Sequence, residues 1–234
     1  MRFQPFDCRK DASLAFEKEY FENLEYLGRE ALIRRHFLEV LGWASKASRS
    51  CLSSGVDKTA LDVGCAFGYG VKVLKSLGYD TCGLDVSVYS VRRAKKLDRS
   101  TDYLVCDAQH GFPFKNDAFD LITCFEVLEH LSNPLKTIKN LFASCRGAII
   151  CTTPNRTVEK PLKSLVNDCD HTHINIRTPD EWKKDLQQVF GSDAFVKVEP
   201  FLDTNLKIGD NLLFFKSFRI PFFGLDTRII IRKK

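Results

Sequence analysis

Between residues 59 and 153, short apolar runs alternate with amphipathic segments. The runs are TALDVG (59–64), YDTCGLDV (79–86), YLVC (103–106), FDLITCF (119–125) and GAIICTT (147–153). Segments with helical periodicity lie between the first runs and after the fourth, at 71–78, 90–97 and 134–142. This repeated order of strand, helix and strand predicts a parallel α/β sheet covered by helices on both faces.

The flanking segments add helices and strands but no separate linker. Residues 11–50 carry apolar side chains at helical spacing, and a helix is expected at 179–190 after Pro179. Strands are expected near 195–200 and at 227–232. We therefore expect an N-terminal helical extension over residues 1–57 and a single globular unit over 58–234.

The formal net charge of +5 is concentrated at one end of the chain. Residues 1–57 are neutral and residues 58–200 carry +1, whereas residues 201–234 carry +4 and six of the nineteen phenylalanines. A chain that binds nucleic acid usually shows a broad basic surface. The distribution argues against nucleic acid as a partner and marks a local basic, aromatic C-terminal feature.

The nine cysteines show no CxxC pair and no zinc-finger spacing. Most of them stand in or beside apolar runs, where a thiol behaves as a small buried hydrophobe: Cys65, Cys82, Cys106, Cys124 and Cys151. The N-terminus has no apolar signal-peptide core, and no run is long enough to cross a membrane. We expect a cytoplasmic protein with reduced thiols and no transmembrane segment.

The segment LDVGCAFGYG (61–70) carries the strongest functional signal. A strand ends at Asp62, and Gly64 and Gly68 then bracket a turn into the next helix. Glycine lets the backbone pass close to a ligand, and the free N–H groups at a helix start favour an anion. The G-x-x-x-G spacing differs from the G-x-G-x-x-G of dinucleotide binders, which argues against a dinucleotide oxidoreductase.

Two further acids close the next two strands. Asp85 ends the run CGLDV, 21 positions after Gly64, where an acid at a strand tip can accept from both hydroxyls of a ribose. Asp107 ends the following run and is placed to accept from an exocyclic amine. Each acid alone fits a helix cap or turn equally well, but three at successive strand tips favour a binding site.

These segments, together with CDAQHGFPFKNDAFDLITCFEVLEHL and AIICTTPN, strongly resemble the class I S-adenosylmethionine-dependent methyltransferases. The resemblance runs from about residue 20 to 200 and is specific through 59–155. It implies a Rossmann-like three-layer sandwich with a seven-stranded, mostly parallel sheet whose last strand is antiparallel. It also implies that residues 58–234 form the methyltransferase domain.

The same resemblance implies the residues that bind S-adenosylmethionine. The loop of Gly64, Cys65, Ala66 and Gly68 would wrap the methionine part, supported by Asp62. The nucleoside part would be bound by the strand ends and the side chains that follow them: Asp85, Val86, Asp107, Ala108 and Phe125. Many family members have glycine where this chain has Ala66, so the local shape of the loop is open.

The segment Glu126-Val-Leu-Glu129-His130 would place Glu126, Glu129 and His130 on one face of a helix. With a later histidine these groups could hold a divalent metal. The resemblance implies three alternatives: magnesium ligands, residues that brace the loop, or a general base at His130. The sequence leaves the three open.

The polar run 170–182 contains His171 and His173 and resembles the acceptor side of small-molecule members of the family. Either histidine is a candidate general base, and a purely structural hydrogen bond is the competing interpretation. We list His130 and His173 as the catalytic candidates.

The Phe-rich, basic segment 211–224 is expected to connect the last two strands and to help close the acceptor pocket. Its composition also fits a homodimer or membrane-surface contact. Packing of its phenylalanines in the core is the interpretation we favour.

Together these features predict methyl transfer from S-adenosylmethionine to an oxygen or nitrogen of a small molecule, in which the donor supplies the activated methyl group. Two alternatives are a magnesium-dependent RNA 3′-terminal 2′-O-methyltransferase and a non-catalytic partner subunit with the same fold. The acceptor and the oligomeric state are not determined by the sequence.

Overall fold

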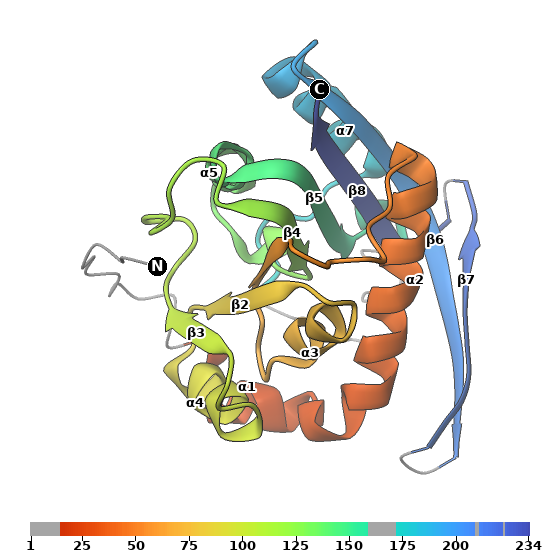
Figure 1. Cartoon of the computed structure of the whole chain (residues 1–234). Helices are drawn as coiled ribbons and strands as arrows, with labels where there is room; N and C mark the ends of the chain where they lie inside the picture. Colours follow the sequence, from red (N-terminus) through yellow and green to blue (C-terminus); the bar gives the residue numbers. More distant parts are fainter. Residues whose placement is uncertain (1–14, 159–171, 209–210, 222) are drawn as a thin grey trace.

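The computed structural model describes residues 15–158, 172–208, 211–221 and 223–234. It forms one eight-stranded sheet with the strand order β3-β2-β1-β4-β5-β8-β6-β7 (Figure 1). The parallel part of the sheet contains β1 Thr59–Val63, β2 Asp80–Asp85, β3 Asp102–Val105, β4 Phe119–Phe125 and β5 Cys145–Pro154. The antiparallel part contains β6 Ala194–Ile208, β7 Asn211–Arg219 and β8 Asp226–Lys233.

The helices connect and cover these strands. The described helices are α1 Lys18–Asn23, η2 Tyr26–Arg29, α2 Glu30–Ser48, α3 Tyr69–Ser76, α4 Val88–Leu97, η3 Leu128–His130, α5 Pro134–Ser144 and α7 Pro179–Phe190. None of the helices within the described residues combines the length and the apolarity that crossing a bilayer requires. The strand and helix positions agree closely with the sequence pattern, which the 12-residue helix after Pro179 shows best.

Two apolar clusters on opposite faces of the sheet make the fold three-layered. On one face, α2 and α3 pack over small and branched strand residues such as Ala60, Leu121 and Ile150. On the other face, α5 and α7 pack over their strand neighbours, such as Leu61 and Ile122. Successive side chains of a strand point to opposite faces, so one run of apolar residues supplies both clusters.

The C-terminal half of the sheet departs from the prediction in one respect. All seven expected strands are present, but residues 211–219 form an eighth strand, β7, and β6 is longer than expected, so the two make a long hairpin beside α2 (Figure 1). The segment 211–224 was interpreted as a connection between the last two strands, as the family resemblance implies.

The prediction that the phenylalanines of 211–224 pack in the core is wrong for three of them. Phe215 is buried, but Phe214, Phe218 and Phe223 are 47%, 42% and 70% exposed. Side chains alternate across a strand, so Phe214 and Phe218 lie on the face of β7 opposite Phe215, whereas Phe223 lies between β7 and β8. A dimer or membrane contact through this segment stays a prediction.

The cysteines behave as the sequence indicates. Among the described residues all seven are free thiols, and only Cys51 is exposed. Cys8 and Cys169 lie outside the described residues.

Candidate functional site

A cavity of about 650 Å³ opens at the carboxyl ends of the parallel strands. The strand order reverses at β1, which pairs with β2 on one side and β4 on the other, and ligands bind at such a switch point. Eleven of the twelve predicted site residues line it: Asp62, Gly64, Cys65, Ala66, Asp85, Val86, Asp107, Ala108, Phe125, His130 and His173. Gly68 is not among the lining residues.

The loop between β1 and α3 turns sharply under the cavity. Gly64 and Gly68 have φ of 74° and 80°, and the Gly64 and Cys65 N–H groups both donate to the Leu84 carbonyl, at 2.7 and 3.0 Å. A Cβ on Gly64 would lie 2.2 Å from Val127 Cγ2. Both glycines are therefore required by the backbone itself, and Gly68 caps α3 from behind the cavity wall.

Ala66 adopts the conformation for which glycine is better suited. Its φ is 46°, and its N–H donates to Asp85 Oδ2 at 2.8 Å. That hydrogen bond holds the loop to the tip of β2 although left-handed backbone is unfavourable for alanine. The loop therefore keeps the shape that a glycine would give it.

Asp62 is buried beneath the loop. Thr123 Oγ1 donates to its Oδ1 at 2.7 Å, and a Cβ on Gly70 would come within 2.5 Å of its Oδ2. Burial raises the pKa of Asp62 to about 7, the Thr123 hydrogen bond opposes this, and the nearby Asp85 adds to it. A cationic group bound in the cavity would favour the charged form of Asp62.

Asp85 and Asp107 are held by the turns that follow their strands. Asp85 Oδ1 accepts from the Ser87 N–H at 2.8 Å, and Asp107 Oδ1 accepts from the Gln109 N–H at the same distance. Burial raises the pKa of Asp85, while the N–H groups of Ser87 and Ala66 act against it. Each acid thus both stabilises a turn and lines the cavity. The turn-forming role and the position at a candidate binding site are therefore compatible.

Aromatic residues of the N-terminal helices close the cavity on the side of α1 and η2. Phe21 and Tyr26 pack with Phe67, at ring-centroid distances of 4.9 and 5.0 Å, and Phe37 lies 4.2 Å from Phe125. Burial, followed by the charges of Asp62 and Asp85, raises the pKa of Tyr26 well above its ordinary range. The sequence pattern places these rings on helices, but it carries no signal that the helices reach the site.

The group of Glu126, Glu129 and His130 is not on one helical face, which corrects the prediction. Glu126 has φ of 53° and reverses the chain directly after β4, and the helical turn η3 is only three residues long. The Glu126 carboxylate accepts from Thr152 Oγ1 at 2.8 Å, whereas buried Glu129 accepts from Thr153 Oγ1 at 3.1 Å. The helical spacing fails because the strand end imposes its own turn.

Glu129 and His130 instead meet His173 from a later loop. One nitrogen or oxygen from each of the three residues lies within 4.8 Å of the others, and the His130 and His173 rings are 4.9 Å apart. His130 Nδ1 is 3.1 Å from the Thr172 carbonyl oxygen. These donors suit a divalent cation, and they also suit the bracing role. His171 lies outside the described residues.

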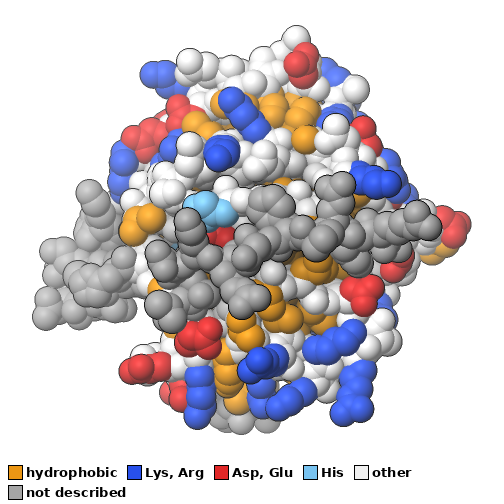
Figure 2. All heavy atoms as spheres, turned by 90° about the vertical axis from the view of Figure 1, so that its left-hand side faces the viewer, with side chains coloured by type: hydrophobic (Ala, Val, Ile, Leu, Met, Phe, Trp, Pro, Cys, Tyr) orange, Lys and Arg blue, Asp and Glu red, His pale blue; other side chains and the backbone are white. Residues whose placement is uncertain are grey.

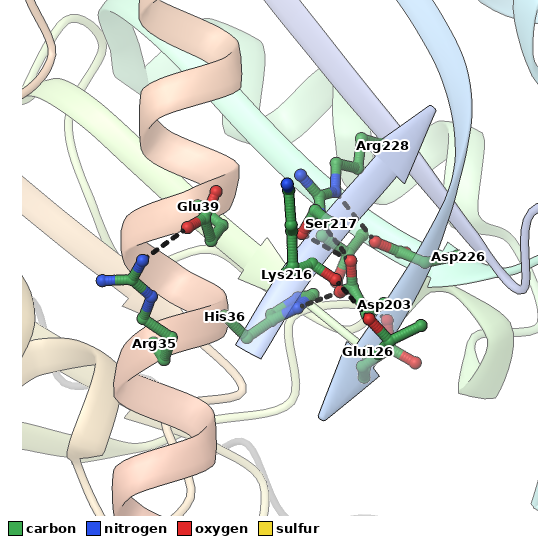
Figure 3. A network of polar contacts seen from close by, with 11 residues as sticks. Arg35, His36, Glu39, Glu126, Asp203, Lys216, Ser217, Asp226 and Arg228 are labelled. Atoms are coloured by element: carbon green, nitrogen blue, oxygen red, sulfur yellow. Dashed lines mark hydrogen bonds and ion pairs between the residues drawn. The ribbon is translucent and has the colours of Figure 1, made fainter. Parts of the chain in front are cut away.

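A second polar group lines the same cavity where α2 meets β6 and β8 (Figure 3). His36 Nδ1 lies 2.7 Å from Asp203 Oδ2, and Arg228 reaches both Asp203 and Asp226. Burial raises the pKa of neighbouring Glu126 to about 7, and the charge of Asp226 adds to the shift. The sequence pattern gave no sign of this group, because His36 and Asp203 are 167 residues apart.

Comparison with known proteins identifies the family. A family model described as a methyltransferase domain matches residues 29–189, more than half of the chain. The chain belongs to this methyltransferase family. The fold class and the resemblance predicted from the sequence are therefore confirmed.

Two kinds of relatives show how far the similarity extends. Ubiquinone biosynthesis O-methyltransferase from Aliivibrio fischeri is 29% identical over 146 residues, which cover 56% of this chain and 62% of that protein. The plantazolicin methyltransferase BpumL, solved with a desmethyl-plantazolicin analogue and SAH, superposes with a TM-score of 0.68 at 17% identity, covering 95% of each chain. A SAM-dependent methyltransferase from Archaeoglobus fulgidus has a TM-score of 0.67 at 19% identity, covering 92% of this chain and all of that one. The methyltransferase thus shares its fold with the solved structures, and it spans about three fifths of the curated relative's length.

Proposed function

We propose that this methyltransferase transfers a methyl group from S-adenosylmethionine to an oxygen or nitrogen of a small molecule. The observation that carries the proposal is the set of three carboxylates, Asp62, Asp85 and Asp107, at three neighbouring strand tips of one cavity. The donor offers a cationic amine, a ribose diol and an adenine amine, all of which donate to carboxylates. The residues present therefore suit this donor.

The remaining cavity residues match the rest of the donor. The Gly64–Gly68 loop would accept the methionine part, because Gly64, Cys65 and Ala66 line the cavity and α3 begins directly after the loop. Val86, Ala108 and Phe125 offer apolar contacts for the adenine. The donor brings an already activated methyl group, so the protein mainly has to position the two partners and exclude water.

Oxygen is the acceptor atom that the curated relatives favour, since they are named as O-methyltransferases. The first test is calorimetry of S-adenosylhomocysteine binding to the whole chain. The second is release of S-adenosylhomocysteine from S-adenosylmethionine over a panel of phenols, alcohols, amines and thiols. A wild-type chain that binds neither S-adenosylhomocysteine nor S-adenosylmethionine would contradict the proposal. A chain that binds the donor but transfers to no acceptor would instead support the non-catalytic partner subunit.

One observation keeps a metal-assisted RNA enzyme as a second candidate, namely the meeting of Glu129, His130 and His173. Against it stands the charge, since residues 1–200 carry a net +1 only. Figure 2 shows acidic and basic side chains interspersed around one face, with hydrophobic side chains between them. Magnesium-dependent methylation of RNA 3′ ends, abolished by EDTA, would favour this candidate, and EDTA-insensitive transfer to a small molecule would remove it.

A further inference from the structure

A histidine–aspartate pair lines the same cavity as the three strand-tip acids. His36 comes from α2, and its ring points toward Asp203 of β6 (Figure 3). The Nδ1–Oδ2 distance is 2.7 Å, and the side chains of His36 and Asp203 are 21% and 18% exposed. A hydrogen bond this short, with little solvent around it, sets the orientation of the imidazole.

Asp203 is itself held in place by its other oxygen. Its Oδ1 accepts from Arg228 Nη2 at 2.7 Å and from Ser217 Oγ at 2.6 Å. Burial opposes ionisation of Asp203, but its contacts with His36, Arg228 and Ser217 outweigh burial and lower its pKa. A charged Asp203 accepts a hydrogen bond from Nδ1–H, so the neutral imidazole carries its lone pair on Nε2.

His36 Nε2 is shielded from solvent and has no hydrogen-bond partner among the described residues. Buried polar atoms are normally paired, and an unpaired one calls for an explanation. His36 lines the cavity, so a ligand bound there that displaces the groups covering Nε2 is the natural partner. An Nε2 lone pair requires a donor, and a hydroxyl group is the donor that an O-methyltransferase acceptor brings.

We propose that His36 is a catalytic residue that binds the acceptor hydroxyl through Nε2 and takes its proton. This inference rests on the proposed function. In the step, the acceptor oxygen forms a bond to the methyl carbon, the carbon–sulfur bond breaks, and its electron pair stays on sulfur. The hydroxyl proton moves to Nε2 and later to water, with Asp203 stabilising the imidazolium as a positioning residue.

The surroundings of His36 favour a phenol as the acceptor. The rings of Phe125 and Phe215 lie 5.9 and 6.2 Å from the His36 ring in edge-to-face arrangements, so an aromatic acceptor would find ring contacts beside the imidazole. A phenol has a pKa near 10, like tyrosine, which is within reach of an imidazole base. An alkanol is far less acidic, so the same base would help it much less.

A divalent cation fits this place less well. One nitrogen or oxygen of each of His36, Asp203 and Asp226 lies within 4.8 Å of the others, which resembles a ligand set. However, the buried Arg228 guanidinium contacts both carboxylates, at 2.7 and 3.1 Å. Arg228 already balances their charge and would repel a second cation.

The pH dependence follows from the groups that face His36. They come from β6, β8 and the turn after β4: Asp203, Asp226, Arg228 and Glu126. Burial lowers the pKa of His36, but the Asp203 hydrogen bond and the charge of Asp226 outweigh burial, so the pKa lies above its ordinary value. Only neutral His36 accepts a proton, so turnover should rise with pH through this raised pKa. Asp203→Asn removes the carboxylate and should move the rise to lower pH.

The test uses the full chain with S-adenosylmethionine and two probe acceptors, catechol and 4-nitrocatechol. Catechol is chosen because buried Asp226 Oδ1 also has no hydrogen-bond partner among the residues that the structure describes and could accept from the second hydroxyl. The nitro group makes the second probe acidic enough to be largely ionised at neutral pH. Loss of a base should therefore lower the rate of catechol methylation and leave the rate of nitrocatechol methylation nearly unchanged. A general loss of structure would lower both rates.

We expect His36→Gln to lower kcat for catechol by about 100-fold or more and to change it much less for nitrocatechol. S-adenosylhomocysteine affinity should stay within about twofold, since we propose that this ligand binds at the three strand-tip acids and not at the pair. Asp80→Asn, at the exposed opposite end of β2, is the matched control for Asp203→Asn and should leave the pH profile unchanged.

Three outcomes would overturn the inference. An equal loss for both probes, or none, would leave His36 without a proton-accepting role. The same catechol-selective loss in His130→Gln or His173→Gln, but not in His36→Gln, would move the base to those residues. A wild-type chain could also bind S-adenosylhomocysteine and yet fail to methylate catechol. That result would contradict a phenol as the acceptor and would leave the proposed donor site in place. A chain that does not bind S-adenosylhomocysteine would instead contradict the proposed function.

Discussion

The two ends of the cavity are built in different ways. At the end that we propose for the donor, called the donor end, Asp62, Asp85 and Asp107 lie at the tips of short strands, and their partners come from the adjacent turns and the neighbouring strand. At the end that we propose for the acceptor, called the acceptor end, His36 of α2 meets Asp203 of β6 and Arg228 of β8. The donor end is local in sequence, and the acceptor end depends on the packing of distant elements.

This difference separates the tasks of the two ends. Turns at parallel strand tips place backbone N–H groups and carboxylates reproducibly, so one arrangement can serve one invariant ligand. The acceptor end instead uses the antiparallel strands β6 and β8 and the helix α2, whose side chains can change without disturbing the turns. Substitutions that act on one end only will break or sharpen this contrast.

The largest effect is expected at the acceptor end, for Arg228→Met. Arg228 is 1% exposed, pairs with Asp203 and Asp226, and lies 4.1 Å above the Phe201 ring. Its removal leaves two buried carboxylates without their cation, which should lower the free energy of unfolding by about 3–5 kcal/mol in urea titrations. Arg35→Met removes an exposed ion pair with Glu39 and should change the free energy of unfolding by less than about 1 kcal/mol. Equal effects of the two variants would contradict the buried network.

The next effect is expected at the donor end, for Asp85→Ala. The substitution removes the carboxylate proposed to bind the ribose diol, and hydrogen bonds to charged groups contribute about 1.5–3 kcal/mol each. S-adenosylhomocysteine affinity should therefore fall by about 100-fold or more in calorimetry. Asp80→Ala, on the same strand but exposed, should leave the affinity unchanged. Thermal unfolding of both variants separates lost binding from lost structure, and undiminished binding by folded Asp85→Ala would refute the assignment.

A smaller effect concerns the pH dependence of donor binding. Burial first, and then the charge of Asp85, raise the pKa of Asp62 to about 7, so Asp62 is mostly neutral below that pH and mostly charged above it. The cationic amine of S-adenosylhomocysteine should prefer the charged form, so affinity should increase by about tenfold between about pH 6 and pH 8. Asp62→Asn should flatten the curve.

Glu126 supplies the control for this measurement. Its pKa is also raised to about 7, chiefly by burial, but it lies at the acceptor end. Glu126→Gln should therefore leave the pH dependence of donor binding in place. If Glu126→Gln flattened the pH dependence of donor binding and Asp62→Asn did not, the donor would bind at the end that we propose for the acceptor.

The smallest effect is expected for Ala66→Gly in the donor loop. Ala66 has φ of 46°, where an L-residue pays about 1–2 kcal/mol and glycine does not. Part of that gain is lost to the freedom of glycine in the unfolded chain, so the variant should be more stable by about 1 kcal/mol or less. Ala47→Gly inside α2 should have the opposite sign, with a loss of about 1 kcal/mol. A loss in both variants would show that the loop is not strained.

The donor end was predictable because its signals are local. Asp85 and Asp107 close apolar runs, and parallel strands bring their carboxyl ends to one edge whatever the helices do. The arrangement of the Glu126–His130 segment was not predictable, because the chain reverses direction at Glu126 instead of following the assumed helical spacing. The sequence did not predict the strand β7, because an edge strand with one exposed face lacks the continuous apolar pattern of a buried strand.

The sequence by itself determined the α/β class, the family, the donor loop and the succession of strands and helices apart from β7. All of these follow from periodicity and turn residues that act over short distances. Only the tertiary structure decided that Glu129 and His130 meet His173, and that His36 pairs with Asp203 over 167 residues of chain. Such contacts arise where α2 packs beside the β6–β7 hairpin, and no local pattern records which side chains will face each other there.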